Sequence, residues 1–313
     1  MTLSRETLGL FLGTIGVVIF GVTLPMTRIA VGSLDPWFVT SGRATLAGLV
    51  ALVVLMALRK KMPRGREFYT LLVGAAFTII GFPGFTGFAM RLVPASHGGV
   101  VLGILPLAVA MFAAMASGER PSRGFWISAV MGAALVVGFS LRDGGGSFGL
   151  GDVLLIGSVV SAAAGYTAFA RLTKTRPGWE VVSWAVVIGL PLTVPLALWT
   201  APADVNAVPV THWAAFAYLG LMSQYIGFFF WNAGLAMGGQ ARVSQTQLLQ
   251  TFVTLGCAAL INGESVDWLT WAFAVAVVGV VLIGRNTRID RKAPLSWPYL
   301  YNKIRLADLK KMI

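Results

Sequence analysis

The main pattern along the chain is a series of long apolar runs, separated by short stretches that carry most of the charge. Each run is about 17–24 residues long, enough for a helix to cross a hydrocarbon layer about 30 Å thick. Runs of this length favour membrane-spanning helices over the short amphipathic stripes of soluble proteins. We expect an all-α membrane protein with ten such helices, at residues 8–24, 37–58, 68–91, 95–117, 124–141, 150–171, 181–200, 213–237, 241–262 and 268–284.

The ninth run is unusual because it carries many amides and hydroxyls. Its polar residues recur at helical spacing and would share one face, which holds Ser244, Gln247, Gln250, Thr251 and Thr254. Uncharged polar side chains are costly against lipid, so this face is expected to meet protein or water. We therefore predict that Ser244, Gln247, Gln250 and Thr251 bind substrate.

The third run predicts a bent helix with aromatic side chains along one side. Pro83 lacks a backbone donor and stands among glycines, so a kink or break is expected there. Phe82, Phe85 and Phe88 recur every three residues around it. We predict that Phe82 and Phe85 contact substrate.

The eighth run combines aromatic rings with amides, in Gln224, Tyr225, Trp231 and Asn232. As a set, the third and eighth runs favour a cavity wall for a ring-bearing substrate, whose ammonium group would also rest against a ring face. Any one of these rings, taken singly, fits helix packing or lipid contact more simply. These four residues are predicted to bind substrate.

Arg43 is a charge inside the second run, which costs about 2.5–3.5 kcal/mol at the bilayer centre and less near the interface. One interpretation is structural: the side chain reaches the outer surface or bonds backbone carbonyls. The other is that it binds a substrate carboxylate, with Tyr166 and Thr78 as neutral donors and acceptors. An uncharged, partly aromatic cavity suits a zwitterion better than a phosphate ester, which needs several cationic groups.

Composition supports the membrane class. Hydrophobic residues make up 57% of the chain, charged residues 12%, and the mean hydropathy is +0.79. A soluble domain carries roughly 25% charged residues. The single cysteine, Cys257, excludes an internal disulfide. The first run has a weak basic flank and no cleavage site before the next run, so we interpret it as a span and not as a signal peptide.

The net charge of +12 follows position along the chain. With a cytoplasmic N-terminus, 20 of the 24 basic residues fall in cytoplasmic segments. This asymmetry places both termini on the cytoplasmic side of the membrane. It also argues against a nucleic-acid partner, since no basic face belongs to a soluble fold.

An internal repeat with an offset of about 145 residues divides the runs into two sets. Gly118-Glu119 aligns with Gly263-Glu264, and Trp126 aligns with Trp271. Five spans per copy is an odd number, so the second copy is expected to be inverted, as in many secondary transporters. We expect a first repeat at 1–146, an inverted second repeat at 147–285, and a tail at 286–313 that is either a basic cytoplasmic segment or a non-native remnant.

The order of short spans, the two Gly-Glu pairs and the arginine in the second run resemble the EamA-type branch of the drug/metabolite transporter superfamily, over about residues 8–285. Within it the chain is most similar to bacterial aromatic amino-acid exporters. Phe20-Gly21 departs from the Trp-Gly of many members, which bears on the subfamily and not on the fold. The resemblance implies ten helices in two inverted repeats that move small metabolites outward.

Catalytic and metal-binding patterns are absent from the sequence. No Asp or Glu lies in the middle of a run, and the two histidines, His97 and His212, have no metal-ligand spacing to other side chains. We therefore expect no enzyme activity, no cofactor and no carboxylate-based proton coupling. His97 is the one candidate proton carrier or substrate contact, and the alternative is a helix-start residue bonded to backbone or water.

Together these patterns predict an alternating-access exporter of small amphipathic metabolites, with aromatic or hydrophobic amino acids as the expected substrates, which acts as a monomer in the lipid bilayer. Two alternatives stay open. The first is an exporter of a different substrate, either a drug cation or another small metabolite. The second is a protein of a different class, a membrane enzyme or assembly factor without transport activity.

Overall fold

The computed structural model describes residues 4–117, 120–143, 147–239, 243, 246–286 and 289–290. Within these residues the chain is helical, apart from two-residue strands β1 (Arg120–Pro121) and β2 (Ile289–Asp290), which pair antiparallel. The helices are α1 (Arg5–Gly21), α2 (Thr23–Ala30), α3 (Pro36–Ala57), α4 (Arg66–Ala75), η1 (Ala76–Gly81), α5 (Phe82–Leu92), α6 (Ala95–Leu102), α7 (Leu105–Ser117), α8 (Arg123–Asp143), α9 (Leu150–Leu172), α10 (Gly178–Trp199), α11 (Val210–Tyr218), η2 (Leu219–Ile226), α12 (Gly227–Gly238), α14 (Leu249–Asn262) and α15 (Trp268–Asn286).

Eight helical segments are long and apolar enough to cross a membrane, and each lies within a few residues of an expected span. The ninth and tenth runs give shorter apolar helices, Leu249–Asn262 and Trp268–Gly284. The ninth begins only at Leu249, after a turn at Gln247 and Leu248, and residues 241, 242, 244 and 245 of the expected span lie outside the described residues. The all-helical membrane class is confirmed, and the number of ten spans stays a prediction.

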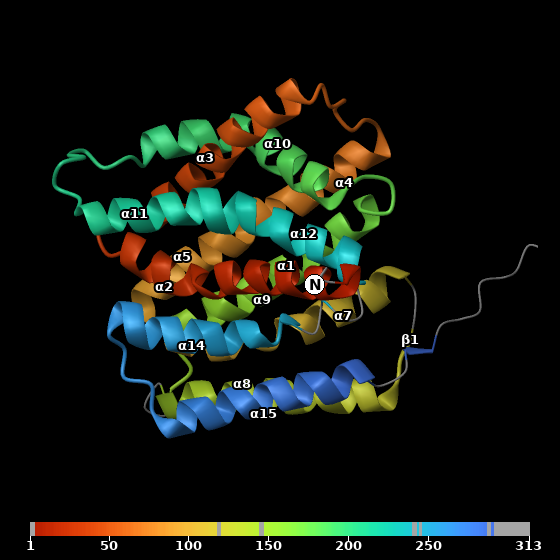
Figure 1. The fold of residues 1–313 in the computed structure, drawn as a ribbon. Coiled ribbons are helices and arrows are strands. Elements are labelled where there is room, and N and C mark those ends of the chain that lie inside the picture. Colours follow the sequence, from red (N-terminus) through yellow and green to blue (C-terminus); the bar gives the residue numbers. More distant parts are fainter. Residues whose placement is uncertain are drawn as a thin grey trace, which may run out of the picture.

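Helices from the first and second halves of the chain pack against each other throughout the bundle (Figure 1). α3 packs along α10 and α1 along α12, and contacts also join α5 to α9, α6 to α14 and α8 to α15. Every one of these pairs takes one helix from each set of five runs. Any cavity inside the bundle is therefore lined by both halves.

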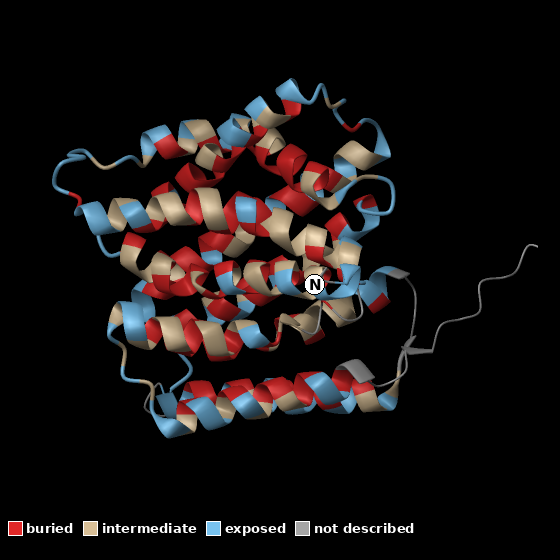
Figure 2. Cartoon of the chain, viewed as in Figure 1, coloured by how far each residue is buried: buried red, intermediate tan, exposed pale blue. Residues whose placement is uncertain are grey.

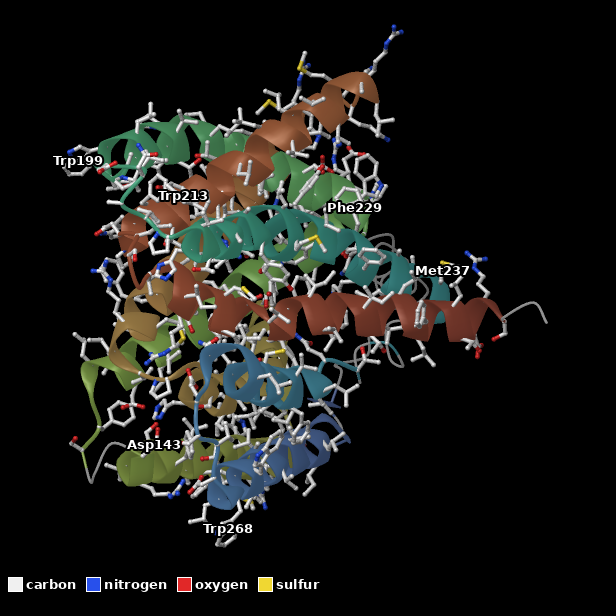
Figure 3. All side chains as sticks on the ribbon, turned by 60° about the vertical axis from the view of Figure 1, so that its left-hand side comes forward. Asp143, Trp199, Trp213, Phe229, Met237 and Trp268 are labelled. Carbon is white, nitrogen blue, oxygen red and sulfur yellow. The ribbon has the colours of Figure 1, made fainter. Side chains whose placement is uncertain are left out.

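Buried residues lie on the faces where helices meet, and exposed apolar residues cover the surface of the bundle (Figure 2). Trp199 and Trp268 are 84% and 74% exposed, and both point away from the helices (Figure 3). Tryptophans at helix ends are typical of the boundary between lipid and water.

Glycines let α1 and α12 approach closely. A Cβ added at Gly9 would lie 2.1 Å from the nitrogen of Gly238, and one at Gly234 would lie 2.6 Å from the nitrogen of Gly13. Small residues allow such backbone contact between membrane helices, where dispersion contacts take the place of the hydrophobic effect. Gly138 and Gly279 face open space instead, so a glycine in a span does not by itself mark a helix contact.

The bend expected at Pro83 is a π-helical turn. η1 directly precedes Phe82 and Pro83, and the helix continues through them without a break. η2 occupies the same place in the eighth run, where no proline marks it. π turns insert one extra residue into a helix, and they often lie at functional positions.

The connections gather at two opposite ends of the bundle (Figure 1). We call one the Glu264 end, which holds the connections at 31–35, 200–209 and 263–267. We call the other the Lys60 end, which holds the connections at 58–65 and 173–177. The charge distribution predicts that the Lys60 end lies in the cytoplasm.

Candidate functional site

The junction between α1 and α2 is the polar centre of the molecule. The helix is interrupted at Val22, which leaves carbonyl groups at the end of α1 to be satisfied by other donors. The Tyr218 hydroxyl donates to the Ile19 carbonyl at 2.8 Å, and Thr254 Oγ1 donates to the Gly21 carbonyl at 2.8 Å. Helices of the second half thus complete a helix end of the first.

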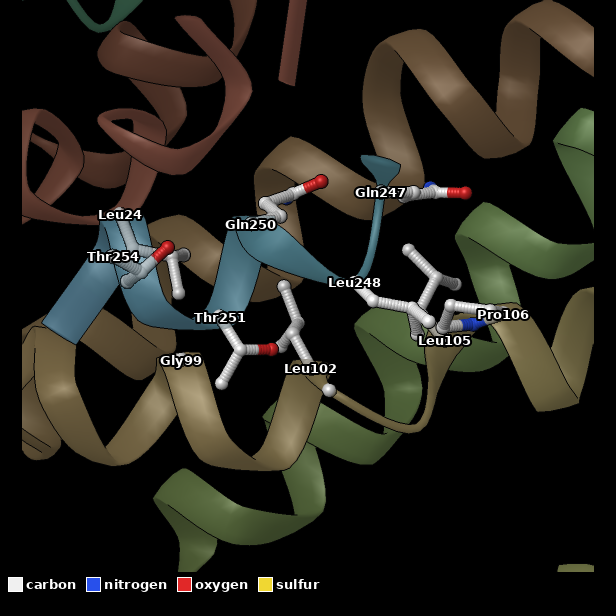
Figure 4. Close-up of a pocket in the computed structure, with 11 residues that line it drawn as sticks. Leu24, Gly99, Leu102, Leu105, Pro106, Gln247, Leu248, Gln250, Thr251 and Thr254 are labelled. Atoms are coloured by element: carbon white, nitrogen blue, oxygen red, sulfur yellow. The ribbon is translucent and has the colours of Figure 1, made fainter. Parts of the chain in front are cut away.

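A small hollow lies beside this junction, between α6 and α14 (Figure 4). Its volume is about 20 Å³, room for a water molecule but not for an amino acid. Its wall consists of Leu24, Gly99, Leu102, Gly103, Leu105, Pro106, Gln247, Leu248, Gln250, Thr251 and Thr254. The hollow therefore combines two amides and two hydroxyls with an aliphatic lining.

The polar face of the ninth run supplies those polar groups. Gln247 and Gln250 are half-buried and Thr251 is buried, and all three line the hollow. Gly99 and Gly103 of α6 leave room for the threonines: a Cβ at Gly99 would lie 2.9 Å from Thr254 Cγ2. Ser244 lies outside the described residues.

Arg43 lies on the other side of the α1–α2 junction and is fully enclosed, with only 2% of the residue exposed. Its Nη2 donates to Ser223 Oγ at 3.0 Å, and Ser223 shares a hydrogen bond of 2.8 Å with Thr23, the residue before Leu24. Nε and Nη1 are buried and have no hydrogen-bond partner among the described residues. Among the described residues the side chain neither reaches the surface nor bonds a backbone carbonyl, so neither contact expected for a structural role is found. Binding of a substrate carboxylate by Arg43 stays a prediction.

Two tyrosines complete the surroundings of this guanidinium group. Tyr166 of α9 and Tyr218 of α11 both interact electrostatically with Arg43. Tyr166 and Thr23 were predicted from sequence as neutral donors or acceptors, whereas Tyr218 and Ser223 were missed. Their signal was weak, because both come from the eighth run and only the fold brings that run to Arg43 of the second.

The predicted aromatic wall does not line the hollow in the described structure. Tyr225 is buried, with its hydroxyl 2.9 Å from Ser183 Oγ of α10 and its ring 4.9 Å from that of Phe229. Phe85 is 39% exposed and packs its ring against the backbone of Gly157.

The remaining predicted contacts are spread over several helix interfaces. Trp231 lies against α1 at Gly16, and Asn232 lies against the start of α10 at Gly178. Thr78 is buried against α9 at Gly165, and Gln224 is buried within η2. Phe82 packs against the buried apolar cluster that also contacts Tyr166. None of these five residues lines the hollow in the described part of the chain.

His97 is bonded to two carboxylates, contrary to the expected contact with backbone or water. Its Nδ1 is 2.5 Å from Asp143 Oδ2 and its Nε2 is 2.7 Å from Asp152 Oδ1. The aspartates follow His97 by 46 and 55 residues, so sequence spacing gave no sign of the cluster.

Glu264 explains one of the Gly-Glu pairs. Gly263 ends α14 with a φ of +67°, a conformation that glycine adopts without strain. The turn brings the Glu264 carboxylate to the backbone nitrogens of Ala95 and Ser96, at 2.8 and 2.9 Å, and to Arg28 Nε at 3.3 Å. The carboxylate thus caps α6. Gly118-Glu119 lies outside the described residues.

The Lys60 end also carries a charge network that joins the two halves. Arg176 bonds Glu67 at 3.0 Å and Glu180 at 2.6 Å, and Lys60 lies 3.4 Å from Glu180. Ion pairs and caps therefore close both ends of the bundle.

Comparison with known proteins identifies the family to which this architecture belongs. The model of the EamA-like transporter family matches residues 7–141 and again residues 149–285. An uncharacterized transporter, YdeK, from Bacillus subtilis (strain 168) is 42% identical over 284 residues, which are 91% of this chain and 99% of that protein. A solved crystal structure superimposes with a TM-score of 0.59 at 20% identity, over 90% of this chain and 99% of the other.

Two more distant relatives carry more specific names. A probable terminal-alkyne amino-acid exporter of Streptantibioticus cattleyicolor is 25% identical over 95% of this chain and 99% of its own length. The aromatic amino acid exporter YddG of Ancylobacter novellus is 26% identical over 79% of this chain and 92% of its own length.

Proposed function

Because the chain belongs to the EamA-like transporter family, in which both halves match the family model, we propose that it exports small zwitterionic metabolites, with amino acids as the substrate class. It is a membrane transporter and its relatives are named as transporters or exporters. The proposed architecture is ten spans in two inverted repeats, in a bacterial inner membrane, with both termini cytoplasmic. A single copy encloses the path.

Arg43 carries this proposal. Two nitrogens of this buried guanidinium group, Nε and Nη1, have lost water without gaining a hydrogen bond from the described residues, which is costly unless an anion completes them. A carboxylate matches the geometry of a guanidinium fork. The hollow, whose wall includes Leu24 next to Thr23, offers the amides of Gln247 and Gln250 to the rest of an amphipathic substrate.

The hollow is too small for an amino acid in this structure, so binding requires α6 and α14 to separate. Their shared wall of Gly99, Gly103 and Thr251 has few large side chains to displace. We propose that the two halves alternate between an opening at the Lys60 end and an opening at the Glu264 end. The Glu264 end is the outer one.

The test is flux of labelled phenylalanine and leucine in proteoliposomes. Arg43→Gln should lower flux by about 10-fold or more, since a hydrogen bond to a charged group contributes about 1.5–3 kcal/mol. Arg91→Gln is the matched control, because Arg91 bonds only the carbonyls of Val31 and Leu34 among the described residues, and it should stay within about twofold of wild type.

A competition screen tests the chemistry of recognition. Free amino acids should compete with the labelled substrate, and their methyl esters, which lack the carboxylate, should not. Equal competition by esters, or normal flux through Arg43→Gln, would contradict the proposed site. Strong competition by organic cations instead would favour a drug-cation cargo.

A further inference from the structure

The contacts of His97 fix how many protons its cluster holds. A neutral imidazole has one N–H donor and one lone pair, so it would turn that lone pair toward one of the two carboxylates. Both contacts, at 2.5 Å to Asp143 and 2.7 Å to Asp152, are hydrogen bonds when the ring carries two protons. Carboxylates are stronger acids than imidazolium, which places both protons on His97.

The charged groups around the cluster are already committed to other partners. Arg142 of α8 pairs with Asp267, and Arg91 of α5 bonds two backbone carbonyls. Arg28 of α2 pairs with Glu264, which precedes α15 and caps α6. Cys257 of α14, Arg123 of α8 and Tyr166 and Arg171 of α9 are the remaining titratable groups on the described parts of neighbouring helices, and no described bond joins them to the cluster. Among the described residues, His97 is therefore the cation that pairs with Asp143 and Asp152.

The cluster also joins three helices beside the hollow. His97 lies in the first turn of α6, whose next turn supplies Gly99 and Leu102 to the wall of the hollow. Asp143 ends α8 and Asp152 begins α9, so the two hydrogen bonds fasten α6 to both. The His97 and Asp152 side chains are 3% and 5% exposed, but Asp143 is 35% exposed and meets water at the Glu264 end.

We propose that His97, Asp143 and Asp152 form a proton-binding site that holds the outer side of the hollow closed. When His97 loses a proton to outside water through Asp143, one ring nitrogen presents its lone pair to a carboxylate. That hydrogen bond is lost, and α6 is released from α8 or α9. By linkage, protonation and closure stabilise each other. The assignment of the outer side rests on the proposed function.

The site responds to outer pH and not to the pH gradient. Its water-exposed member lies at the Glu264 end, and the proton returns to the side from which it came. The sequence has no carboxylate in the middle of a run to carry a proton across. Flux at a fixed outer pH should therefore be the same with and without a gradient.

Nitrogen NMR of the full-length protein tests the protonation state without any substrate. The chain has two histidines, and His212→Gln leaves the His97 signals alone. At pH 6.5 both ring nitrogens of His97 should show imidazolium shifts, and in Asp143→Asn/Asp152→Asn they should show neutral shifts. A neutral ring in the wild-type protein at pH 6.5 would overturn the proposal.

Cysteine labelling tests the coupling to closure. In a Cys257→Ser chain, Leu102→Cys reports access to the hollow for an impermeant maleimide added at the Glu264 side. At pH 6.5 the double asparagine variant should label at least about threefold faster than the parent. As the pH is raised to 8.5 and His97 loses its proton, the parent rate should approach that of the double variant. Thiol ionisation affects both rates equally, so it does not change their ratio. Equal rates at pH 6.5, or a ratio that does not change with pH, would contradict the proposal.

Asp267→Asn is the matched control, an aspartate at the same end that does not touch the cluster. Bonds from Thr270 and Arg142 lower the pKa of Asp267 to about 2, so it stays charged from pH 6.5 to 8.5. The ratio of the labelling rate of this variant to that of the parent should not change with pH. If the NMR and labelling results hold while Arg43→Gln transports normally, the proton site stands and the proposed substrate site fails.

Discussion

Side chains that satisfy helix ends are the connectors of this fold at the scale of residues. Thr254 and Tyr218 complete carbonyls of α1, and Glu264 completes the amides of α6. Each comes from the other half of the chain. A membrane interior offers no water for such groups, so these bonds constrain how the halves meet.

Glu264→Gln should lower the thermal stability of the protein in detergent. The amide keeps part of the cap but loses the pair with Arg28 and the favourable charge at the start of α6. We expect a loss of about 1–2 kcal/mol in unfolding free energy, read as a lower Tm. Glu67→Gln, at the exposed Lys60 end, is the control and should change Tm less. An equal effect of both would show that the cap is unimportant.

Sequence reasoning succeeded for residues whose role follows from one helix and failed where it depends on two. Helical spacing predicted that Gln247, Gln250 and Thr251 lie together, and they do line one hollow, although Gln247 lies in the turn before α14. The bonds of His97 were not predictable, because the carboxylates come from other helices. Tyr225 was predicted as a substrate contact, but it lies in η2, where the extra residue of a π turn rotates side chains away from their α-helical positions.

At the scale of elements, hydropathy located the spans. Proline and glycine residues located only some of the bends. Pro83 marked the position of η1. η2 has no comparable residue, and nothing in its hydropathy separates it from a regular helix. Glycines likewise mark contacts only where a partner helix is present.

Gly234→Ala should separate α1 from α12, because the added Cβ would lie 2.6 Å from the backbone nitrogen of Gly13. The expected result is a loss of more than about 1 kcal/mol in stability, as for overpacked interfaces, read as a lower Tm in detergent. Gly279→Ala faces open space and should match or exceed wild type, since alanine favours helix. A tolerated Gly234→Ala would show that the two helices are free to adjust.

At the scale of the whole molecule, the contacts join helices across the two halves. α3 with α10, α1 with α12 and α5 with α9 are all pairs of this kind. The division into two repeats was predictable from the sequence, and the family model matches each of them. The pairing of helices was not predictable, because an apolar face does not specify which helix it packs against. Only shape and a few polar groups select the partner helix.

Orientation is testable by labelling in intact cells. In a Cys257→Ser chain, Ala203→Cys lies in the connection after α10 and Lys61→Cys in the connection after α3. An impermeant maleimide should label Ala203→Cys from outside and Lys61→Cys only after the cells are opened, as the charge distribution predicts. Labelling of Lys61→Cys in intact cells would reverse the assignment of outer and inner sides.

The two π turns give the molecule a way to change shape without unfolding. The surplus residue in η1 or η2 can pass to the neighbouring turn, which swivels the following helix segment about its own axis while its backbone hydrogen bonds re-form one at a time. α5 and α12 follow these turns, and they pack on α9 and α1. Rotation of α5 or α12 would therefore displace the helix of the other half on which it packs. The two π turns would then move together in a single rocking movement of the halves.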